Sequence, residues 1–241
     1  MDPQHLRPAG VAGRRRGVLF DVDGTLVDSS YIHTLAWWQA FRQQGHDVPM
    51  ASIHHCVGMG GDRLVDSLVP HGRDKNADAD LIASHAALFA SNWAVLRPFD
   101  GARDLLAQCH FGGLAVAPAS SARTQDLMAT RRALGSDAHI HAATSANDAK
   151  ASKPAPDILV AALEAVGVKS ADAVYVGDAV WDMQAAGALG MPAIGLTCGG
   201  TSAAELREAG AAEVYSGPRD LLDNLQSSAI GRLLAASSAG G

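Results

Sequence analysis

The chain has 241 residues, of which 48% are hydrophobic and 18% charged, so it resembles an ordinary globular protein with a sizeable core. Its formal net charge of -6 argues against a nucleic-acid partner, because binding to a phosphate backbone depends on basic patches. Cys56, Cys109 and Cys198 are too few and too widely spaced for a disulfide framework or a zinc site. No apolar run reaches the length of a membrane span, so we expect a cytoplasmic protein without membrane contact.

The chain begins with a polar segment and then a short apolar one. Residues 1–16 include three consecutive arginines but no apolar stretch long enough for a signal peptide, and we expect a disordered leader. Residues 17–20 are all apolar or glycine, without alternation, which predicts a buried parallel strand.

Two carboxylates follow this predicted strand, in the segment Asp-Val-Asp-Gly-Thr-Leu-Val-Asp at 21–28. Asp21 and Asp23 point to the same side because side chains alternate along a strand, and Gly24 allows the chain to turn beside them. Two such carboxylates repel each other unless a hard divalent cation lies between them or one keeps its proton. A solvated acidic turn before a helix would have the same local sequence.

Residues 30–97 contain helical patterns and no predicted strand. Arg63 follows a glycine-rich loop that includes Gly60 and Gly61, where the backbone can approach a ligand closely. Arg63 is a candidate contact for an anionic substrate group, although a solvated arginine fits the pattern equally well. Helices are predicted at 28–44, 52–57, 62–68 and 79–93.

The remaining sequence alternates strands with helices, which predicts a doubly wound parallel α/β sheet. Ligands of such sheets lie at the carboxyl ends of the strands. Residues 228–241 are rich in small side chains, and we expect them to form a weakly ordered tail. Strands are predicted at 114–117, 173–176, 193–196 and 213–215, and helices at 102–109, 124–134 and 202–209.

Ser120 and Ser121 follow the strand predicted at 114–117 and precede a helix. A hydroxyl and the free amides of a helix start can hold an anion there, although either serine could also be a plain helix cap. Pro118 and Ala119 intervene between the predicted strand and Ser120, so the choice between the two serines stays open.

Three further charged residues, Lys153, Asp178 and Asp182, lie next to predicted strand ends or helix starts. Lys153 precedes a proline-started helix in Lys-Pro-Ala-Pro-Asp, and a fixed ammonium there would balance clustered carboxylates. Asp178 follows the strand predicted at 173–176, and Asp182 lies one helical turn later, so both can face one point.

Taken in order, these four segments resemble the four motifs of the haloacid dehalogenase-like (HAD) hydrolases, over about residues 17–216. The resemblance implies a Rossmann-like core at 17–29 and 98–227 with an inserted helical cap at 30–97. It implies that Asp21 is the nucleophile and Asp23 the acid/base, with Lys153 as a further catalytic and phosphate-binding residue beside Ser120 or Ser121. It also implies Mg²⁺ as the cofactor, bound by Asp21, Asp178 and the backbone carbonyl of Asp23, with Asp182 holding a metal-bound water. In the cap, Arg63, Gly60 and Gly61 are the expected substrate contacts.

The implied reaction is hydrolysis of a small phosphorylated metabolite, of the phosphoglycolate or sugar phosphate class, through an aspartyl-phosphate. We expect a monomer or a homodimer. A β-phosphoglucomutase-like phosphosugar mutase would share all four motifs, and a catalytically silent binding protein would share the fold. A metal-independent dehalogenase is disfavoured by Asp23. A phosphonate-cleaving enzyme would need a desolvated cap lysine, whereas Lys75 lies in a polar stretch.

Overall fold

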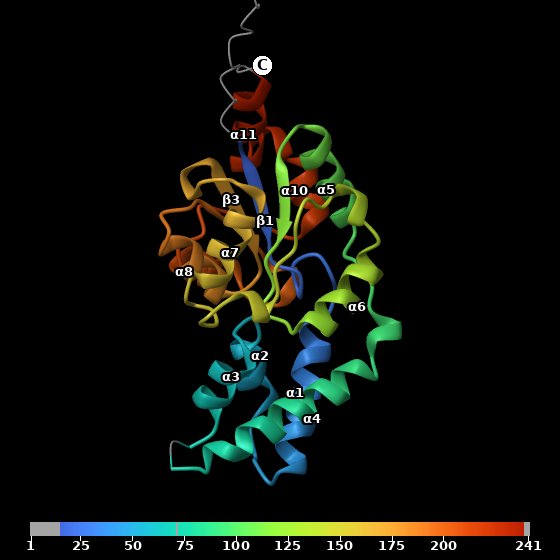
Figure 1. Cartoon of the computed structure of the whole chain (residues 1–241), viewed down its shortest axis with the longest axis vertical. Helices are drawn as coiled ribbons and strands as arrows, with labels where there is room; N and C mark the ends of the chain where they lie inside the picture. The colour runs from blue at the N-terminus through green and yellow to red at the C-terminus, as the bar shows by residue number, and fades with distance from the viewer. Residues whose placement is uncertain (1–14, 71, 239–241) are drawn as a thin grey trace, which may run out of the picture.

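A parallel sheet of five strands forms the centre of the larger part of the molecule in the computed structural model, which describes residues 15–70 and 72–238 (Figure 1). The strands lie in the order β2-β1-β3-β4-β5, and every pairing is parallel. All residues of the first four strands are buried, as their unbroken apolar runs require. The strands are β1 (Gly17–Phe20), β2 (Ala115–Pro118), β3 (Ala173–Gly177), β4 (Ala193–Leu196) and β5 (Glu213–Tyr215).

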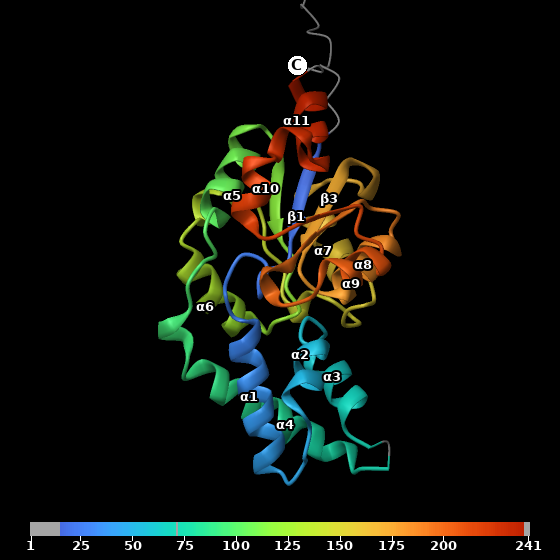
Figure 2. The ribbon, with the colours of Figure 1, turned by 180° about the vertical axis from the view of Figure 1, so that it is seen from behind.

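Helices cover both faces of this sheet, so the predicted doubly wound α/β architecture is confirmed (Figures 1 and 2). Val18 and Phe20 of β1 point into one apolar cluster and Leu19 into the other, because side chains alternate along the strand. The first cluster includes side chains of α5 (Ala102–Phe111), α6 (Thr124–Leu134), α10 (Pro218–Asp223) and α11 (Ala229–Ser238). The second includes side chains of α7 (Asp157–Val166), α8 (Val180–Gly187) and α9 (Ala203–Glu208).

Four helices form a separate bundle beyond the carboxyl ends of the strands, which we call the cap (Figures 1 and 2). The bundle has its own apolar core, built around Trp37, Phe41, Ile53 and Leu81. The chain enters and leaves it side by side: the amide of Asp28 donates to the carbonyl of Arg97. The helices are α1 (Ser30–Gln43), α2 (Met50–Cys56), α3 (Gly61–Leu68) and α4 (Asp78–Ala90).

Short 3₁₀ turns complete the connections between these elements, and they lie at Lys75–Ala77, Trp93–Val95, Asp137–His139, Ala146–Asp148, Ser170–Asp172, Thr197–Gly199 and Leu225–Ser227. No helix in the described part of the chain combines the length and apolarity that crossing a membrane requires.

The C-terminal segment differs from the sequence expectation. A weakly ordered tail was predicted from residue 228, but Ala229–Ser238 forms α11, so that prediction is wrong for this segment. Alanine favours helix, and Ile230 is fully buried in the cluster that contains Leu221 and Leu225. Most of the predicted leader, residues 1–14, and the last three residues of the predicted tail lie outside the described residues.

Pro118 is also placed differently from the expectation, because it is the last residue of β2 rather than part of a following loop. Proline has no N–H to donate to a neighbouring strand. Because β2 is an edge strand, no strand of the sheet lies on its outer side to need that hydrogen bond. Ser120 therefore lies two residues beyond the strand end.

Candidate active site

The carboxyl ends of three neighbouring strands bring the predicted motif residues together. Asp21 directly follows β1, Ser120 follows β2 and Asp178 follows β3, and all three residues are buried. Parallel strands that lie side by side end at one edge of the sheet, which explains why residues from distant motifs meet there.

Lys153 is the cation of this edge, and it is completely buried. Its Nζ lies 2.7 Å from Asp21 Oδ1, 2.8 Å from Asp182 Oδ1 and 2.8 Å from the hydroxyl of Tyr175. Burial opposes its charge, but the carboxylates of Asp182 and Asp21 outweigh burial and raise the pKa of Lys153. The ammonium is therefore permanently charged and fixed in position.

Asp182 serves as the anchor of Lys153. Its Oδ1 also accepts a hydrogen bond from Tyr175 Oη at 3.0 Å, and its Oδ2 accepts one from the amide of Ala179 at 3.0 Å. Both oxygens are thus engaged by protein donors. The family resemblance implies that Asp182 holds a metal-bound water, and this stays a prediction. In the structure its carboxylate holds the lysine and the start of α8.

A divalent cation fits the carboxylates of this edge. Oxygen atoms of Asp21, Asp178 and Asp182 lie within 4.8 Å of one another. Burial raises the pKa of Asp21 to about 7, against the pull of Lys153, and burial also raises that of Asp178 well above its usual range. Carboxylates that resist ionisation in this way are stabilised by a hard cation, and oxygen ligands suit Mg²⁺.

The Asp178 carboxylate is held by one hydroxyl donor and closely packed by two glycines. Thr25 Oγ1 donates to Asp178 Oδ1 at 2.8 Å. Gly24 and Gly199 approach the carboxylate so closely that a Cβ atom at either position would overlap it. Asp182 differs from Asp21 and Asp178 in that both of its oxygens accept hydrogen bonds from protein donors.

Asp23 faces the cap side of the edge. Its Oδ1 accepts a hydrogen bond from Ser29 Oγ at 2.6 Å and lies 3.2 Å from His33 Nε2, while Oδ2 lies 3.4 Å from Ser120 Oγ. Burial opposes ionisation of Asp23, but His33 and Ser29 outweigh it and lower the pKa of this carboxyl. Ser29 precedes α1 and donates its hydroxyl to Asp23 instead of capping the helix.

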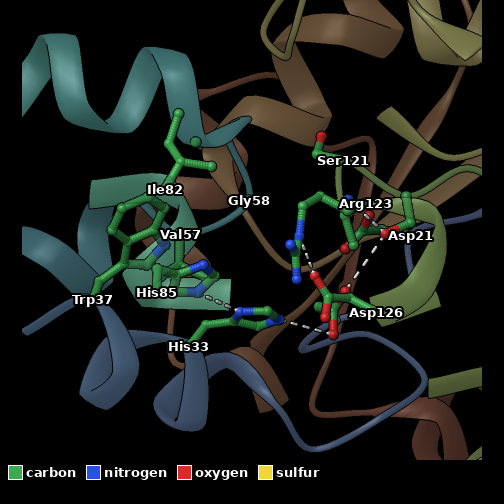
Figure 3. Close-up of a pocket in the computed structure, with 14 residues that line it drawn as sticks. Asp21, His33, Trp37, Val57, Gly58, Ile82, His85, Ser121, Arg123 and Asp126 are labelled. Atoms are coloured by element: carbon green, nitrogen blue, oxygen red, sulfur yellow. Dashed lines mark hydrogen bonds and ion pairs between the residues drawn. The ribbon is translucent and has the colours of Figure 1, made fainter. Parts of the chain in front are cut away.

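Residues of the core and the cap line a partly open cavity of about 80 Å³ between them (Figure 3). His33 Nδ1 lies 3.1 Å from His85 Nε2, and the His85 ring stacks on Trp37 with 4.0 Å between centroids. Burial lowers the pKa of His85 well below its usual value, so this ring is neutral. The lining residues from the core are Asp21, Asp23, Ser120, Ser121, Ala122, Arg123 and Asp126, and those from the cap are His33, Trp37, Val57, Gly58, Gly61, Ile82 and His85.

Both predicted phosphate-binding serines line this cavity. Ser120 Oγ accepts a hydrogen bond from the amide of Ala122 at 3.0 Å, whereas Ser121 Oγ is buried and has no hydrogen-bond partner among the described residues. Both remain candidates for holding phosphoryl oxygens.

The cap contacts expected from sequence are brought together only in part. Gly61 lines the cavity and Gly60 instead packs against Ser152, where a Cβ atom would overlap the serine hydroxyl. Arg63 is exposed on α3 and lies outside the cavity, with Asp62, Asp66 and Ser67. The geometry therefore does not support Arg63 as the contact for an anionic substrate group.

Several residues of the site had no role assigned from the sequence, among them His33, Arg123, Asp126 and Tyr175. The spacing of His33 from Ser29 is a weak indication in the sequence. His33 lies four residues after Ser29, so the two side chains share one helix face and both reach Asp23. Tyr175 lies in an apolar strand, and nothing in its local sequence distinguishes it from a packing residue.

Comparisons with known proteins agree with this geometry. A family model described as haloacid dehalogenase-like hydrolase matches residues 16–190. The phosphoglycolate phosphatase of Yersinia pestis is 31% identical over 192 residues, 76% of this chain and 82% of that protein.

Solved structures extend the match to the whole fold. A hydrolase from Pseudomonas syringae has a TM-score of 0.84 at 30% identity, covering 88% of this chain and 98% of that one. A β-phosphoglucomutase from Clostridium difficile has a TM-score of 0.78 at 16% identity, covering 93% of this chain and 99% of that one, which shows a shared fold. The chain therefore belongs to the haloacid dehalogenase-like hydrolases, and the family match together with the phosphoglycolate phosphatase relative supports a phosphatase enzyme.

Proposed function

We propose that the protein is a Mg²⁺-dependent phosphatase that hydrolyses a small phosphomonoester, of the phosphoglycolate or sugar phosphate class, through an aspartyl-phosphate. The observation that carries this proposal is the contact of Lys153 with Asp21, which lies beside Asp178 and lines the same cavity as Asp23. The relatives named above include a phosphoglycolate phosphatase.

In the first step a carboxylate oxygen of Asp21 attacks phosphorus, and the bond between phosphorus and the ester oxygen breaks. The leaving oxygen takes a proton from the carboxyl group of Asp23. The donors around Asp23 favour its carboxylate, but the negative charge of a bound phosphoryl group opposes them and raises the affinity of Asp23 for this proton.

In the second step the Asp23 carboxylate takes a proton from the attacking water, and the aspartyl-phosphate is hydrolysed. Lys153 and the hydroxyl of Ser120 or Ser121 stabilise charge on the phosphoryl oxygens in both steps. Asp21, Asp178 and the carbonyl of Asp23 would hold Mg²⁺, which supplies charge neutralisation and polarisation of a phosphoryl oxygen.

The test is release of inorganic phosphate from a panel of phosphorylated small molecules with Mg²⁺. Asp21→Asn should lower turnover by about 10⁴-fold or more, since a catalytic nucleophile is removed. The matched control is Asp137→Asn, an exposed carboxylate in the turn after α6 that pairs with Arg131. Retained phosphatase turnover in Asp21→Asn, or full activity with a chelator present, would contradict the proposal.

The mutase alternative is tested in the same assay. With a hexose 1-phosphate as substrate, a phosphatase releases free phosphate, whereas a mutase accumulates the hexose 6-phosphate. We expect free phosphate to be the product.

A further inference from the structure

One buried hydroxyl next to the active site has no task in the proposed reaction. Tyr175 is the third residue of β3, and its side chain is completely buried. Its ring packs in the apolar cluster of α7, α8 and α9, yet its hydroxyl reaches Lys153 and Asp182. A phenylalanine would fill the same apolar space without a polar group to satisfy, so the hydroxyl requires an explanation of its own.

The Tyr175 hydroxyl completes the surroundings of the lysine ammonium. An ammonium group has three hydrogens to donate, and Lys153 Nζ contacts three oxygens of the described residues. These oxygens are Asp21 Oδ1 at 2.7 Å, Asp182 Oδ1 at 2.8 Å and Tyr175 Oη at 2.8 Å. Nζ also lies 5.5 Å from the centre of the Tyr175 ring. The ammonium is therefore held from several sides, and Tyr175 is the uncharged partner.

Tyr175 also shares one carboxylate oxygen with the lysine. Its hydroxyl donates to Asp182 Oδ1 at 3.0 Å, the same oxygen that Lys153 contacts. Burial and the carboxylates of Asp182 and Asp21 raise the pKa of Tyr175, so the hydroxyl keeps the proton that it donates. Because one oxygen accepts from two donors, part of its attraction for the ammonium is taken up by the phenol.

This arrangement matters most when Asp21 is phosphorylated. Asp21 loses its negative charge as its oxygen bonds to phosphorus, so Lys153 loses one of its two carboxylate partners. Asp182 would then draw the ammonium away from the phosphoryl group. The Tyr175 hydroxyl contacts both Nζ and Asp182 Oδ1, and it limits this movement from a fixed place in the central sheet.

We propose that Tyr175 is a positioning residue, whose hydroxyl keeps the Lys153 ammonium directed at the phosphoryl oxygens in both chemical steps. This inference rests on the proposed phosphatase function and deepens it. Tyr175 does not line the cavity, so it acts through Lys153. Its loss should therefore weaken stabilisation of the transition state more than binding of the substrate.

The first test is Tyr175→Phe, which removes the hydroxyl and keeps the packing of the ring. With Mg²⁺ and the best phosphomonoester of the panel, kcat should fall by about 10- to 100-fold while KM changes little. This is the range expected for one hydrogen bond to a charged group. The matched control is Tyr215→Phe, because the Tyr215 hydroxyl also donates to a carboxylate, that of Glu213 on the edge strand β5, at 3.1 Å. The control should leave kcat and KM unchanged.

Inhibition by vanadate and by inorganic phosphate separates positioning from packing. Vanadate adopts the five-coordinate geometry of a phosphoryl group in transfer, whereas inorganic phosphate resembles the product. A transition-state analogue should depend on the exact direction of the ammonium. Tyr175→Phe should therefore weaken inhibition by vanadate by about the factor lost in kcat, and leave inhibition by phosphate nearly unchanged.

Four results would overturn the inference. Unchanged kcat with a lower Tm would mean that the Tyr175 hydroxyl only stabilises the fold. A higher KM with unchanged kcat, or equal weakening of vanadate and phosphate inhibition, would mean that it acts on ground-state binding. A loss of the same size in Tyr215→Phe would mean that the effect is not specific to the site. Failure of the proposed function is distinguishable, because the wild-type protein would then release no phosphate from any ester.

Discussion

Lys153 Nζ lies 2.7 Å from Asp21 Oδ1, and both residues are buried although 132 positions separate them in the chain. The contact joins the end of the central strand β1 to the loop before α7. A buried carboxylate would otherwise resist ionisation, and burial does raise the pKa of Asp21. The lysine lowers the pKa of Asp21 against the effect of burial, and in the proposed reaction it would also stabilise a phosphoryl oxygen.

Replacing this lysine should affect stability as well as activity. Lys153→Met leaves Asp21 and Asp182 buried without their counterion, and breaking a buried pair in this way costs about 3–5 kcal/mol. Urea denaturation should show the loss, with Lys150→Met, an exposed lysine three residues earlier, as the control. A Lys153→Met protein as stable as the wild type would show that the pair contributes no net stability.

Replacing Asp23 should separate the two halves of the proposed reaction. A nitrophenyl phosphate has a leaving group that needs no proton, so Asp23→Asn should still release one equivalent of nitrophenol in a burst. Turnover after the burst should fall by about 10²–10⁴-fold, the usual contribution of general acid–base catalysis. An alkyl phosphate should show no burst.

The control for this experiment is Asp28→Asn, because Asp28 is exposed in the same loop. Stopped-flow absorbance measures the burst. Normal steady-state turnover of alkyl phosphates by Asp23→Asn would remove Asp23 from the mechanism.

Stability should depend on pH and Mg²⁺ together. In metal-free protein Asp21 has a pKa of about 7 when folded and near its ordinary 3.8 when unfolded. The folded state therefore keeps a proton that the unfolded state loses between these values, so this contribution is present below pH 3.8 and is lost as pH rises towards 7. Asp178 shifts in the same direction.

Mg²⁺ replaces these protons, so it should raise Tm little near about pH 5 and more near about pH 8. A free concentration of 100 times Kd contributes about 2.7 kcal/mol. Thermal denaturation with Mg²⁺ and with a chelator measures the difference. Asp178→Asn should lose most of the Mg²⁺ effect, and a variant that keeps it would argue against Asp178 as a ligand.

Packing of the C-terminal helix α11 against the core should contribute to the free energy of unfolding. Ile230→Ala removes a fully buried side chain from the cluster beside the sheet, which should lower the free energy of unfolding by about 2–5 kcal/mol. Chemical denaturation measures this loss. Arg232→Ala, on the exposed side of the same helix, removes an ion pair with Glu213 and a hydrogen bond to the carbonyl of Ser227, and should change stability by less than about 1 kcal/mol. Equal effects of the two substitutions would mean that α11 is not packed as described.

The sequence by itself determined the sheet and the residues at its edge. Asp21 and Asp178 follow apolar runs, and parallel strands that are buried on both faces have such runs, so their carboxyl ends could be located from local pattern alone. Lys153 was identified by resemblance to a family motif, because nothing in its own segment shows that it would be buried.

Only the tertiary structure decided which groups meet across long separations. Asp182 holds Lys153, and His33 reaches Asp23 when α1 of the cap lies over the strand ends. Arg123, not Arg63, lines the cavity, and local sequence could not distinguish them because each follows a loop and precedes or enters a helix. The physical reason is that a helical pattern fixes which side chains share a face, while the docking of cap on core decides what that face meets.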